Sequence, residues 1–251
     1  MAKEQRRLLI GPGRLSDAAV RASAGPHLTL DNAETHYLQR VLRLRSGDRF
    51  AVVNGVGQLW QAVFEPPHAR LLTELAQPAQ AQPAPSPELL LAVALPRRDG
   101  ELLLRMATEL GIDRLQPLIA ERSVVERWNH QRAAVIVREA VEQCERLWAP
   151  QLDEPAPAGD WLSQPRGLRL LATTRRQQAP LLGEALRQAQ GTHTTHGPSI
   201  GVAIGPEGGW SPAEEKQALS LGWQPVSLGP TILRTSTAAV AAAAALCSWR
   251  G

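Results

Sequence analysis

Apolar and polar residues follow two different patterns along the chain. Up to about residue 75, short apolar runs alternate with turns, and "DRFAVVNGVGQLWQAVF" places an Asn-Gly turn signal between two strand-like stretches. Such a pattern is typical of a β-hairpin. We therefore expect a small β-rich barrel in residues 1–75.

The segment 76–88, "AQPAQAQPAPSPE", interrupts this pattern. It has four prolines among alanine and glutamine, with no periodic apolar positions. A segment of this composition is typical of an extended linker. It divides the expected barrel from a second domain, residues 89–251.

In the second domain, strand-like and helix-like stretches alternate. The runs "ELLLAVAL", "RLQPLIAERS", "LRLLATT", "SIGVAIG" and "WQPVSLG" read as strands, whereas "GELLLRMATELG" and "NHQRAAVIVREAVEQCERLW" have the apolar spacing of helices. This alternation predicts an α/β domain with a mostly parallel sheet. Ligands bind such sheets beyond the carboxyl ends of the strands, where segments 205–209 and 229–230 place glycines.

The segment 205–209, "GPEGG", has more glycine than a strand-to-helix connection needs. Ser211, Pro212 and Glu214 already give the next helix an N-cap, a first-turn proline and a capping box. The glycines form either a tight turn or a ligand loop with accessible backbone amides. The spacing excludes a P-loop and a dinucleotide fingerprint. We therefore expect any ligand there to be held by backbone groups, without a pyrophosphate.

A second loop, "LGPTILRTSTAAVAAAAAL", leads into an alanine-rich helix. Thr235 or Ser236 is expected to cap that helix, because alanine favours helix and hydroxyl side chains favour the N-cap. Arg234 then lies just before the cap, at the same edge of the sheet. It is either a surface charge or part of a site.

Composition adds three expectations. With 251 residues, 43% hydrophobic, the chain can form real cores, and it has neither a membrane span nor a signal peptide. Cys144 and Cys247 are expected to be reduced, buried thiols of a cytoplasmic protein. His193 and His196 have no third ligand near them in sequence, so we expect no metal.

The net charge of +3 is unevenly distributed. Residues 1–78 carry ten Lys+Arg against seven Asp+Glu, while the rest of the chain carries seventeen of each. Nearly all the basic residues are arginine, which suits contacts with phosphates and bases. A GC-rich genome explains the arginine content equally well, so composition permits a nucleic-acid partner without establishing one.

Together, these stretches resemble the RsmE family, the 16S ribosomal RNA uridine N3-methyltransferases of the SPOUT class. "IGPEGGWSPAEE" followed by "LGPTILRTSTAAVAAAAAL" resembles its C-terminal signature, and "HYLQRVLRLRSGD" its N-terminal RNA-binding motif. "RMATELGIDRLQPLIAERSVVERW" and "REAVEQCERLWAP" resemble its central blocks. The motifs occur in the family's order and span nearly the whole chain.

The resemblance implies a fold and a cofactor. The fold is a PUA-like barrel followed by an α/β methyltransferase domain with a trefoil knot, a rare exception among chain topologies. The cofactor is S-adenosylmethionine, and the protein is a cytoplasmic homodimer without metal or membrane. By similarity, the cofactor-binding residues are Leu171, Ala172, Thr173, Thr174, Ile204, Gly205, Pro206, Glu207, Gly208, Gly209, Leu228, Gly229, Pro230, Ile232 and Leu233.

Four positions depart from the family's usual pattern. The family commonly has arginine at Thr231 and glutamate at Ser236, and it usually has lysine at Met106 and glycine at Glu145. Arg234, Glu207 and Arg146 are retained. A mechanism that needs an acidic residue at position 236 is therefore in doubt for this chain.

Uridine N3 methylation requires removal of a weakly acidic proton, and no cysteine nucleophile. We expect Arg234 to stabilise the negative charge that grows on the uracil carbonyl oxygens. Glu207 either accepts the proton or braces its loop. Both are our candidate catalytic residues.

The implied substrate is 16S rRNA or the assembled small ribosomal subunit. "HYLQRVLRLRSGD" reads as a helical turn that carries Arg40 and Arg43 on one face, with Arg45 at its exit. These arginines contact RNA phosphates or, alternatively, brace the barrel through acidic neighbours such as Glu34 and Asp48. The resemblance adds Arg122 and Arg146 as RNA-binding residues.

Two other functions stay open at this point. One is an RNA-binding protein that keeps the fold and has lost catalysis, since four pattern positions have changed. The other is a related SPOUT enzyme that methylates ribose 2′-oxygen or transfer RNA.

Overall fold

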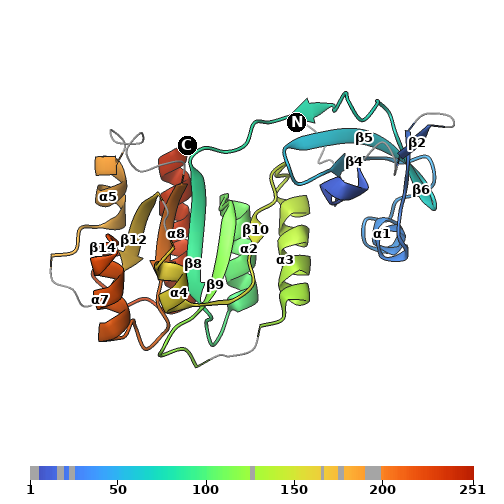
Figure 1. Ribbon diagram of the computed structural model, residues 1–251. Helices are drawn as coiled ribbons and strands as arrows, with labels where there is room; N and C mark the ends of the chain where they lie inside the picture. The colour runs from blue at the N-terminus through green and yellow to red at the C-terminus, as the bar shows by residue number, and fades with distance from the viewer. Residues whose placement is uncertain are drawn as a thin grey trace. The chain divides into compact units, whose positions relative to one another are not determined.

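The computed structural model describes residues 6–15, 20–22, 26–124, 128–164, 167–174, 178–189 and 199–251 (Figure 1). By their contacts they form two compact units. The first contains residues up to Ala84 together with Arg138–Ala149, and the second contains Pro85–Val137 and Pro150–Gly251. The boundaries expected near residues 75 and 89 stay a prediction. The grouping of Arg138–Ala149 with the N-terminal residues was not expected from the sequence.

The first unit is built on a β-sheet. Its strands follow the order β1-β4-β5-β6-β3-β2, and β7 pairs with β5. Their bounds are β1 Arg7–Leu9, β2 Val20–Ala22, β3 Pro26–Thr29, β4 Arg49–Val53, β5 Gln58–Glu65, β6 His68–Leu71 and β7 Gln80–Ala81. Phe50 and Phe64 meet edge to face in the core, with ring centroids 6.4 Å apart. The β-rich character predicted for this part is therefore confirmed.

The predicted hairpin joins β4 to β5. Strand β4 ends at Val53 and β5 begins at Gln58, so the loop consists of residues 54–57. The Asn54 side chain accepts hydrogen bonds from the amides of Val56 (2.9 Å) and Gln58 (3.0 Å), and it is buried. The Asn-Gly signal thus marks a hairpin whose turn is closed by the asparagine itself.

The segment expected to carry arginines on a helical turn is only partly helical. Helix α1 (Asn32–His36) has an Asp31 N-cap and continues into a π-helical turn, η2 (Tyr37–Val41). Arg43 lies beyond this turn with φ of 55°, in the left-handed region. Arg40 and Arg43 therefore do not share a helix face, and that expectation is wrong. A short 3₁₀ turn, η1 (Pro12–Arg14), precedes this region.

The second unit contains the expected parallel sheet. Its strands follow the order β10-β9-β8-β13-β12-β14, with β11 paired to β9, and all these pairs are parallel. The bounds are β8 Glu88–Ala94, β9 Arg114–Ile119, β10 Gln151–Leu152, β11 Ala156–Pro157, β12 Leu168–Ala172, β13 Ser199–Ile204 and β14 Gln224–Val226. Strands covered on both faces read as near-continuous apolar runs, which is why the sequence predicted β8, β9, β12, β13 and β14. The two-residue strands β10 and β11 were not predicted.

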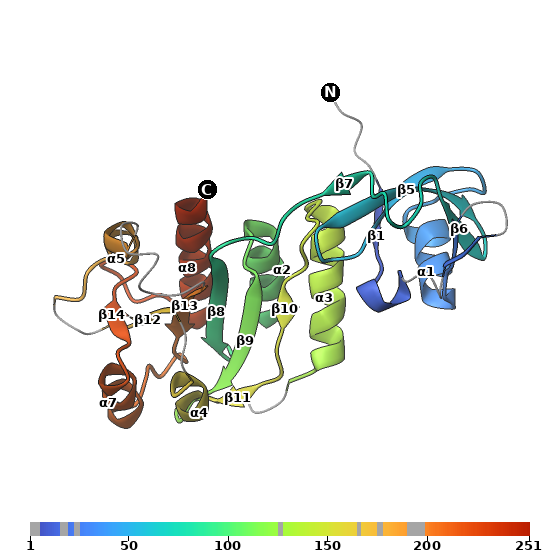
Figure 2. The ribbon, with the colours of Figure 1, turned by 45° about the horizontal axis from the view of Figure 1, so that its top comes forward.

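Helices cover this sheet (Figures 1 and 2). They are α2 Gly100–Leu110, α3 His130–Gln143, α4 Ala158–Leu162, α5 Leu182–Ala189, α7 Pro212–Ser220 and α8 Thr235–Arg250; α3 contributes residues to both units. Helix α8 packs against α2, α5, β8 and β13, whereas α4 packs against α7, β9 and β11. None of the described helices is long and apolar enough to cross a membrane.

The alanines of α8 explain how closely it packs. Ala239, Ala242, Ala243 and Leu246 are fully buried. Small side chains on that face let the helix lie close to the sheet and to its neighbouring helices. On the opposite face of the sheet, where α4 and α7 pack, Trp161 and Trp223 meet with ring centroids 5.4 Å apart. The Trp223 indole there donates to the Leu162 carbonyl. The trefoil knot stays a prediction of the family resemblance.

Both cysteines differ from expectation in their burial. Cys144 and Cys247 are half-buried rather than buried. Cys247 lies on α8 beside Gly111, where a Cβ on the glycine would lie 3.5 Å from its sulfur.

Candidate active site

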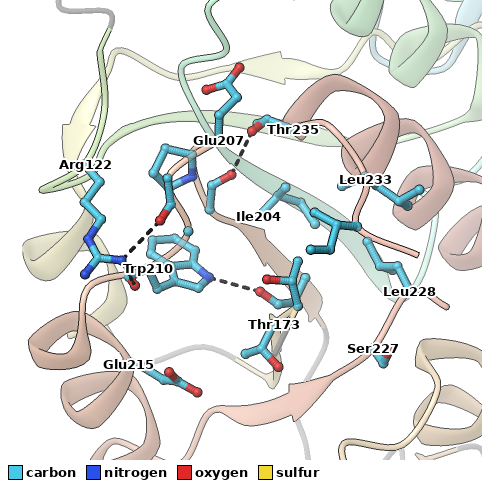
Figure 3. A pocket seen from close by; sticks show the side chains of 18 of the residues that line it. Arg122, Thr173, Ile204, Glu207, Trp210, Glu215, Ser227, Leu228, Leu233 and Thr235 are labelled. Atoms are coloured by element: carbon cyan, nitrogen blue, oxygen red, sulfur yellow. Dashed lines mark hydrogen bonds between the residues drawn. The ribbon is translucent and has the colours of Figure 1, made fainter. Parts of the chain in front are cut away.

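Three neighbouring parallel strands end at one edge of the second unit's sheet. The residues that follow β12, β13 and β14 enclose a cavity of about 390 Å³ (Figure 3). Because β12 lies between β13 and β14, the carboxyl ends of the three strands meet there, as expected for an open α/β sheet. The lining residues are Arg122, Ala172, Thr173, Thr174, Ile204, Gly205, Pro206, Glu207, Gly208, Gly209, Trp210, Glu215, Ser227, Leu228, Gly229, Thr231, Ile232, Leu233, Thr235 and Ala238.

Most of the residues expected to bind cofactor line this cavity. The exceptions are Leu171, which is fully buried in the sheet, and Pro230. Sequence reasoning missed Trp210, Glu215, Ser227, Thr231, Thr235 and Ala238. Ser227 directly precedes the predicted residues 228–230, and Thr231 lies between Pro230 and Ile232. A longer range of residues after each strand would have included both.

The glycine loop after β13 makes a tight turn. The Gly209 amide donates to the Pro206 carbonyl at 2.8 Å. Gly209 has φ of 71°, and a Cβ there would meet nothing within 4 Å. Gly208 does not have a left-handed φ, and a Cβ there would lie 3.2 Å from Cβ of Arg122. A left-handed φ, which favours glycine, therefore occurs at Gly209 and not at Gly208.

Three side chains hold the loop: Arg122 and Thr235 come from other segments, and Trp210 lies at the end of the loop itself. Arg122 Nη1 donates to the carbonyls of Gly208 (3.1 Å) and Trp210 (3.2 Å). The Trp210 indole donates to the Ala172 carbonyl at 3.1 Å, and the Thr235 hydroxyl donates to the Gly205 carbonyl at 3.1 Å (Figure 3). The loop is thereby fixed to the ends of β9 and β12 and to the start of α8.

The helix that follows the loop begins as predicted. The Ser211 hydroxyl accepts from the Glu214 amide at 3.2 Å, and Glu214 Oε2 accepts from the Ser211 amide at 2.9 Å. Pro212 occupies the first helical position. This complete capping box means that α7 needs no help from the glycines.

Helix α8 begins differently from expectation. Its N-cap is Arg234, which makes no capping bond with its side chain, and neither Thr235 nor Ser236 is the cap. Thr235 is the first helical residue and uses its hydroxyl to hold Gly205 instead. The prediction of a hydroxyl cap is therefore wrong, because a contact with a distant loop takes the hydroxyl.

The two candidate catalytic residues differ in their positions. Glu207 lines the cavity, is exposed, and accepts a hydrogen bond from the Arg97 amide at 3.1 Å. Arg234 is exposed at the N-cap of α8 and is not among the lining residues. Arg122 is the arginine among the described lining residues.

Several polar groups at the cavity lack partners within the described part of the chain. The Thr173 hydroxyl oxygen is buried and makes no hydrogen bond there. The amides of Glu207 and Gly208 likewise have no acceptor among the described residues. Buried polar groups are normally satisfied, so the Thr173 hydroxyl indicates where a ligand can bind. The two amides belong to exposed residues that line the same cavity.

Comparisons with known proteins agree over nearly the whole chain. A family model for the RNA methyltransferase domain matches residues 82–247, and one for the RNA methyltransferase PUA domain matches residues 30–72. Ribosomal RNA small subunit methyltransferase E of Synechocystis is 38% identical over 249 residues, which cover 95% of this chain and 76% of the relative. The chain belongs to this family.

Further members extend the likeness. The Rickettsia conorii member is 31% identical and covers 83% of this chain and 84% of its own length. The crystal structure of the Neisseria gonorrhoeae member, bound to S-adenosyl methionine, superposes with a TM-score of 0.77 at 27% identity, covering 97% of each chain. The expected fold, a PUA-like domain followed by a SPOUT-type α/β methyltransferase domain, is confirmed.

One departure from the pattern of the methyltransferase E family has a clear structural setting. Glu145, where the family usually has glycine, has φ of 62°, a conformation that glycine adopts with least strain. Arg7 bonds both its carboxylate (2.8 Å) and its carbonyl (2.6 Å). Arg7 is only 8% exposed, so this ion pair offsets part of the strain.

The other departures lie in different surroundings. Thr231 is exposed at the cavity wall. Ser236 is half-buried in the first turn of α8, and Met106 is half-buried on α2. Nothing in the structure explains the change at Met106.

Most of the arginines expected to bind RNA in the first unit are exposed. Arg40, Arg43 and Arg45 are exposed in the first unit, and Arg146 there is half-buried. The acidic neighbours expected to brace them have other partners: Glu34 pairs with Arg14, and Asp48 accepts from the backbone amide of Arg45. The bracing alternative thus finds no side-chain contact among the described residues.

The remaining expectation concerns metal. His193 and His196 lie outside the described residues. Within the part of the chain that is described, no group of three or more His, Cys, Asp or Glu side chains could hold a metal ion.

Proposed function

We propose that this chain transfers a methyl group from S-adenosylmethionine to N3 of a uridine in the 16S RNA of the small ribosomal subunit. One observation carries the proposal: in a member of the methyltransferase E family, the two glycine-bearing loops and the end of β12 enclose a cavity at the sheet edge. A cavity of about 390 Å³ lies within the usual range for small-molecule sites.

The cavity residues fit this cofactor. The Thr173 hydroxyl and the amides of Glu207 and Gly208 offer a buried hydroxyl and backbone donors for its polar groups. Gly209 and Gly229 have open space where a Cβ would be, so their backbone can approach a ligand closely. S-adenosylmethionine, when bound, supplies an activated methyl group on a positively charged sulfur.

We assign different roles to the two candidate catalytic residues. Arg234 contacts the target base and stabilises charge on the uracil carbonyl oxygens, because it lies exposed beside the cavity's last loop and not within its lining. Glu207 braces the loop, because its carboxylate already accepts the Arg97 amide. The Arg234→Ala variant should then lose methylation rate while keeping cofactor affinity.

RNA binding is assigned to the first unit. Arg40, Arg43 and Arg45 are exposed and would contact phosphates, which gives affinity with little sequence information. Changing all three to alanine should flatten the plot of log affinity against log salt by about two to three. A lower melting temperature with an unchanged slope would instead mean that they stabilise the fold.

We further propose that the chain is a cytoplasmic homodimer. Ala241 and Ala244 remain half-buried on α8 in the single chain, on a smooth face that a second copy can cover. Light scattering should show a dimer at micromolar concentration, and Ala241→Asp should weaken it. A wild-type monomer that is still active would overturn this.

The decisive experiment compares small-subunit rRNA from cells with and without this protein. Mass spectrometry of nucleosides should show loss of 3-methyluridine, restored by the wild-type chain. A methyl group lost from ribose or from transfer RNA would indicate the related SPOUT activities. An intact nucleoside profile together with absent S-adenosylmethionine binding in calorimetry would indicate an RNA-binding protein without catalysis.

A further inference from the structure

Arg122 occupies an unusual place for a residue expected to bind RNA. It follows β9, and its guanidinium reaches the wall of the cavity (Figure 3). A single nitrogen, Nη1, donates to two carbonyls of the glycine loop, those of Gly208 and Trp210. Since Nη1 carries two hydrogens, both are engaged within the protein.

The segment that carries Arg122 is itself fixed. The Glu121 amide donates to Glu214 Oε1 at 2.9 Å, and the Ala120 amide donates to the Ser123 hydroxyl at 3.0 Å. Glu214 is only 8% exposed and also closes the capping box of α7. The backbone of Arg122 is thus tied to the same helix start that the glycine loop enters.

The glycine loop has few other restraints at these two carbonyls. No other side chain in the described part of the chain donates to the carbonyl of Gly208 or of Trp210. Glycine loses more conformational freedom on ordering than any other residue, so a loop with Gly205, Gly208 and Gly209 holds one shape only if contacts fix it. Hydrogen bonds from a charged donor are the stronger kind.

We propose that Arg122 is a positioning residue: it holds residues 205–210 in the shape that binds the cofactor, and it is not primarily a contact to RNA phosphate. The Gly208 carbonyl shares a peptide plane with the Gly209 amide, and the Trp210 carbonyl shares one with the Ser211 amide. The two bonds from Arg122 therefore fix the turn that directly follows the cavity-lining residues Glu207 and Gly208. The inference rests on the proposed function in taking the cavity as the S-adenosylmethionine site.

The test uses Arg122→Ala and Arg122→Lys in the full-length chain. Without cofactor, amide hydrogen exchange at Gly209 should be faster in Arg122→Ala, with a global unfolding midpoint close to that of the wild type. Calorimetry should show S-adenosylmethionine affinity reduced about tenfold or more. Arg122→Lys should recover part of both, since an ammonium can still donate to these carbonyls but lacks the planar fork.

Measurements of RNA binding distinguish this positioning role from a contact between Arg122 and an RNA phosphate. In Arg122→Ala, RNA affinity and its salt dependence should match the wild type. A salt slope reduced by about one, with cofactor affinity and Gly209 exchange unchanged, would overturn the proposal. Arg105→Ala is the matched control: it removes the same charge from the exposed face of α2, outside the cavity lining, and should change neither property.

The exchange measurement does not depend on the proposed function. If the wild type failed to bind S-adenosylmethionine, the proposed function would fail, whereas faster exchange at Gly209 in Arg122→Ala would still support the positioning role. Unchanged exchange in both variants would overturn the positioning role whatever the cofactor result.

Discussion

Two glycine-containing loops of this protein use the same backbone conformation for different ends. In the β4–β5 hairpin, Gly55 and Gly57 have φ of 71° and 94°; in the loop after β13, Gly209 has φ of 71°. A Cβ on Gly57 would lie 2.5 Å from the Gln82 carbonyl oxygen and 2.6 Å from the Trp148 indole nitrogen. A Cβ on Gly209 would meet nothing within 4 Å.

The difference separates a packing role from a binding role. The hairpin glycines make room for neighbours of their own unit, and Asn54 closes the turn from within. The other loop leaves space beside Gly209. It is held from outside by Arg122 and Thr235, and its own Trp210 anchors it to the end of β12. A left-handed glycine that faces open space, in a loop fixed by distant side chains, is therefore the better indicator of a ligand site.

The largest expected effect is on the packed loop. Gly57→Ala adds a clash with backbone and indole to the strain of a left-handed φ, so we expect about 3 kcal/mol of lost unfolding free energy. Gly47→Ala is the matched control in the same unit, because φ is 92° but a Cβ would meet nothing within 4 Å. It should cost about 1 kcal/mol. Equal losses in urea denaturation would show that crowding adds nothing at Gly57.

The next effect concerns binding. Gly209→Val should lower S-adenosylmethionine affinity about 30-fold, because a β-branched residue resists φ of 71° at a position that lines the cavity. The strain of the left-handed φ should also lower the unfolding free energy by about 1 kcal/mol or more, as at Gly47, so the affinity is measured by calorimetry well below the melting midpoint. Gly183→Ala, in α5 with open space around it, should leave the affinity unchanged. Unchanged affinity in Gly209→Val would mean that the glycine serves only the turn.

The smallest effect is a pH dependence confined to the first unit. Burial raises the pKa of Glu142, although hydrogen bonds from the Leu9 amide and Tyr37 partly oppose this. The protonated form is thus favoured in the folded chain. Protonated Glu142 therefore contributes to the unfolding free energy. This contribution is fully present below the ordinary glutamate pKa of about 4.5, and it is lost as pH rises through the higher pKa of the folded chain.

Denaturation at a series of pH values tests this. Unfolding free energy should fall as pH rises above about 4.5 in the wild type, and Glu142→Gln should lack that part of the decline while keeping an acceptor for Leu9. A steeper decline in Glu142→Gln would contradict the assignment. Cofactor affinity should not follow this titration, because Glu142 belongs to the first unit and the cavity to the second.

Local sequence patterns were sufficient for much of the fold. The Asn-Gly hairpin, the apolar strand runs and the Ser211 capping box each depend on residues close together in the chain, and all three are present. The cap predicted for α8 failed because Thr235 bonds a carbonyl thirty positions away. Residues 138–149 were assigned to the second domain because nothing in a helical apolar pattern says which unit the helix contacts.

The candidate site, like the fold, was predicted where nearby residues determine it and missed where distant contacts do. Strand ends and glycines placed the cavity at the right edge of the sheet, and the family resemblance named most of its lining. The role of Arg122 was missed because its partners are carbonyls, which every residue has and no sequence pattern marks. Arg234 was judged from its place in the chain, and only the geometry shows that it lies outside the lining.

The assignment of Arg138–Ala149 to the first unit bears on how the chain folds during synthesis. The hairpin needs Leu147 and Ala149, since the Gly57 amide donates to the Leu147 carbonyl and the Ala149 amide to the Gly55 carbonyl. Leu147 also completes the buried cluster of Ala51, Val53 and Leu59. At about 5–20 residues per second, the ribosome needs several seconds to reach these residues after making the hairpin. The larger core cluster of the unit lies within residues 8–71, whereas the cluster around Leu59 must wait for part of the later sequence before it can close.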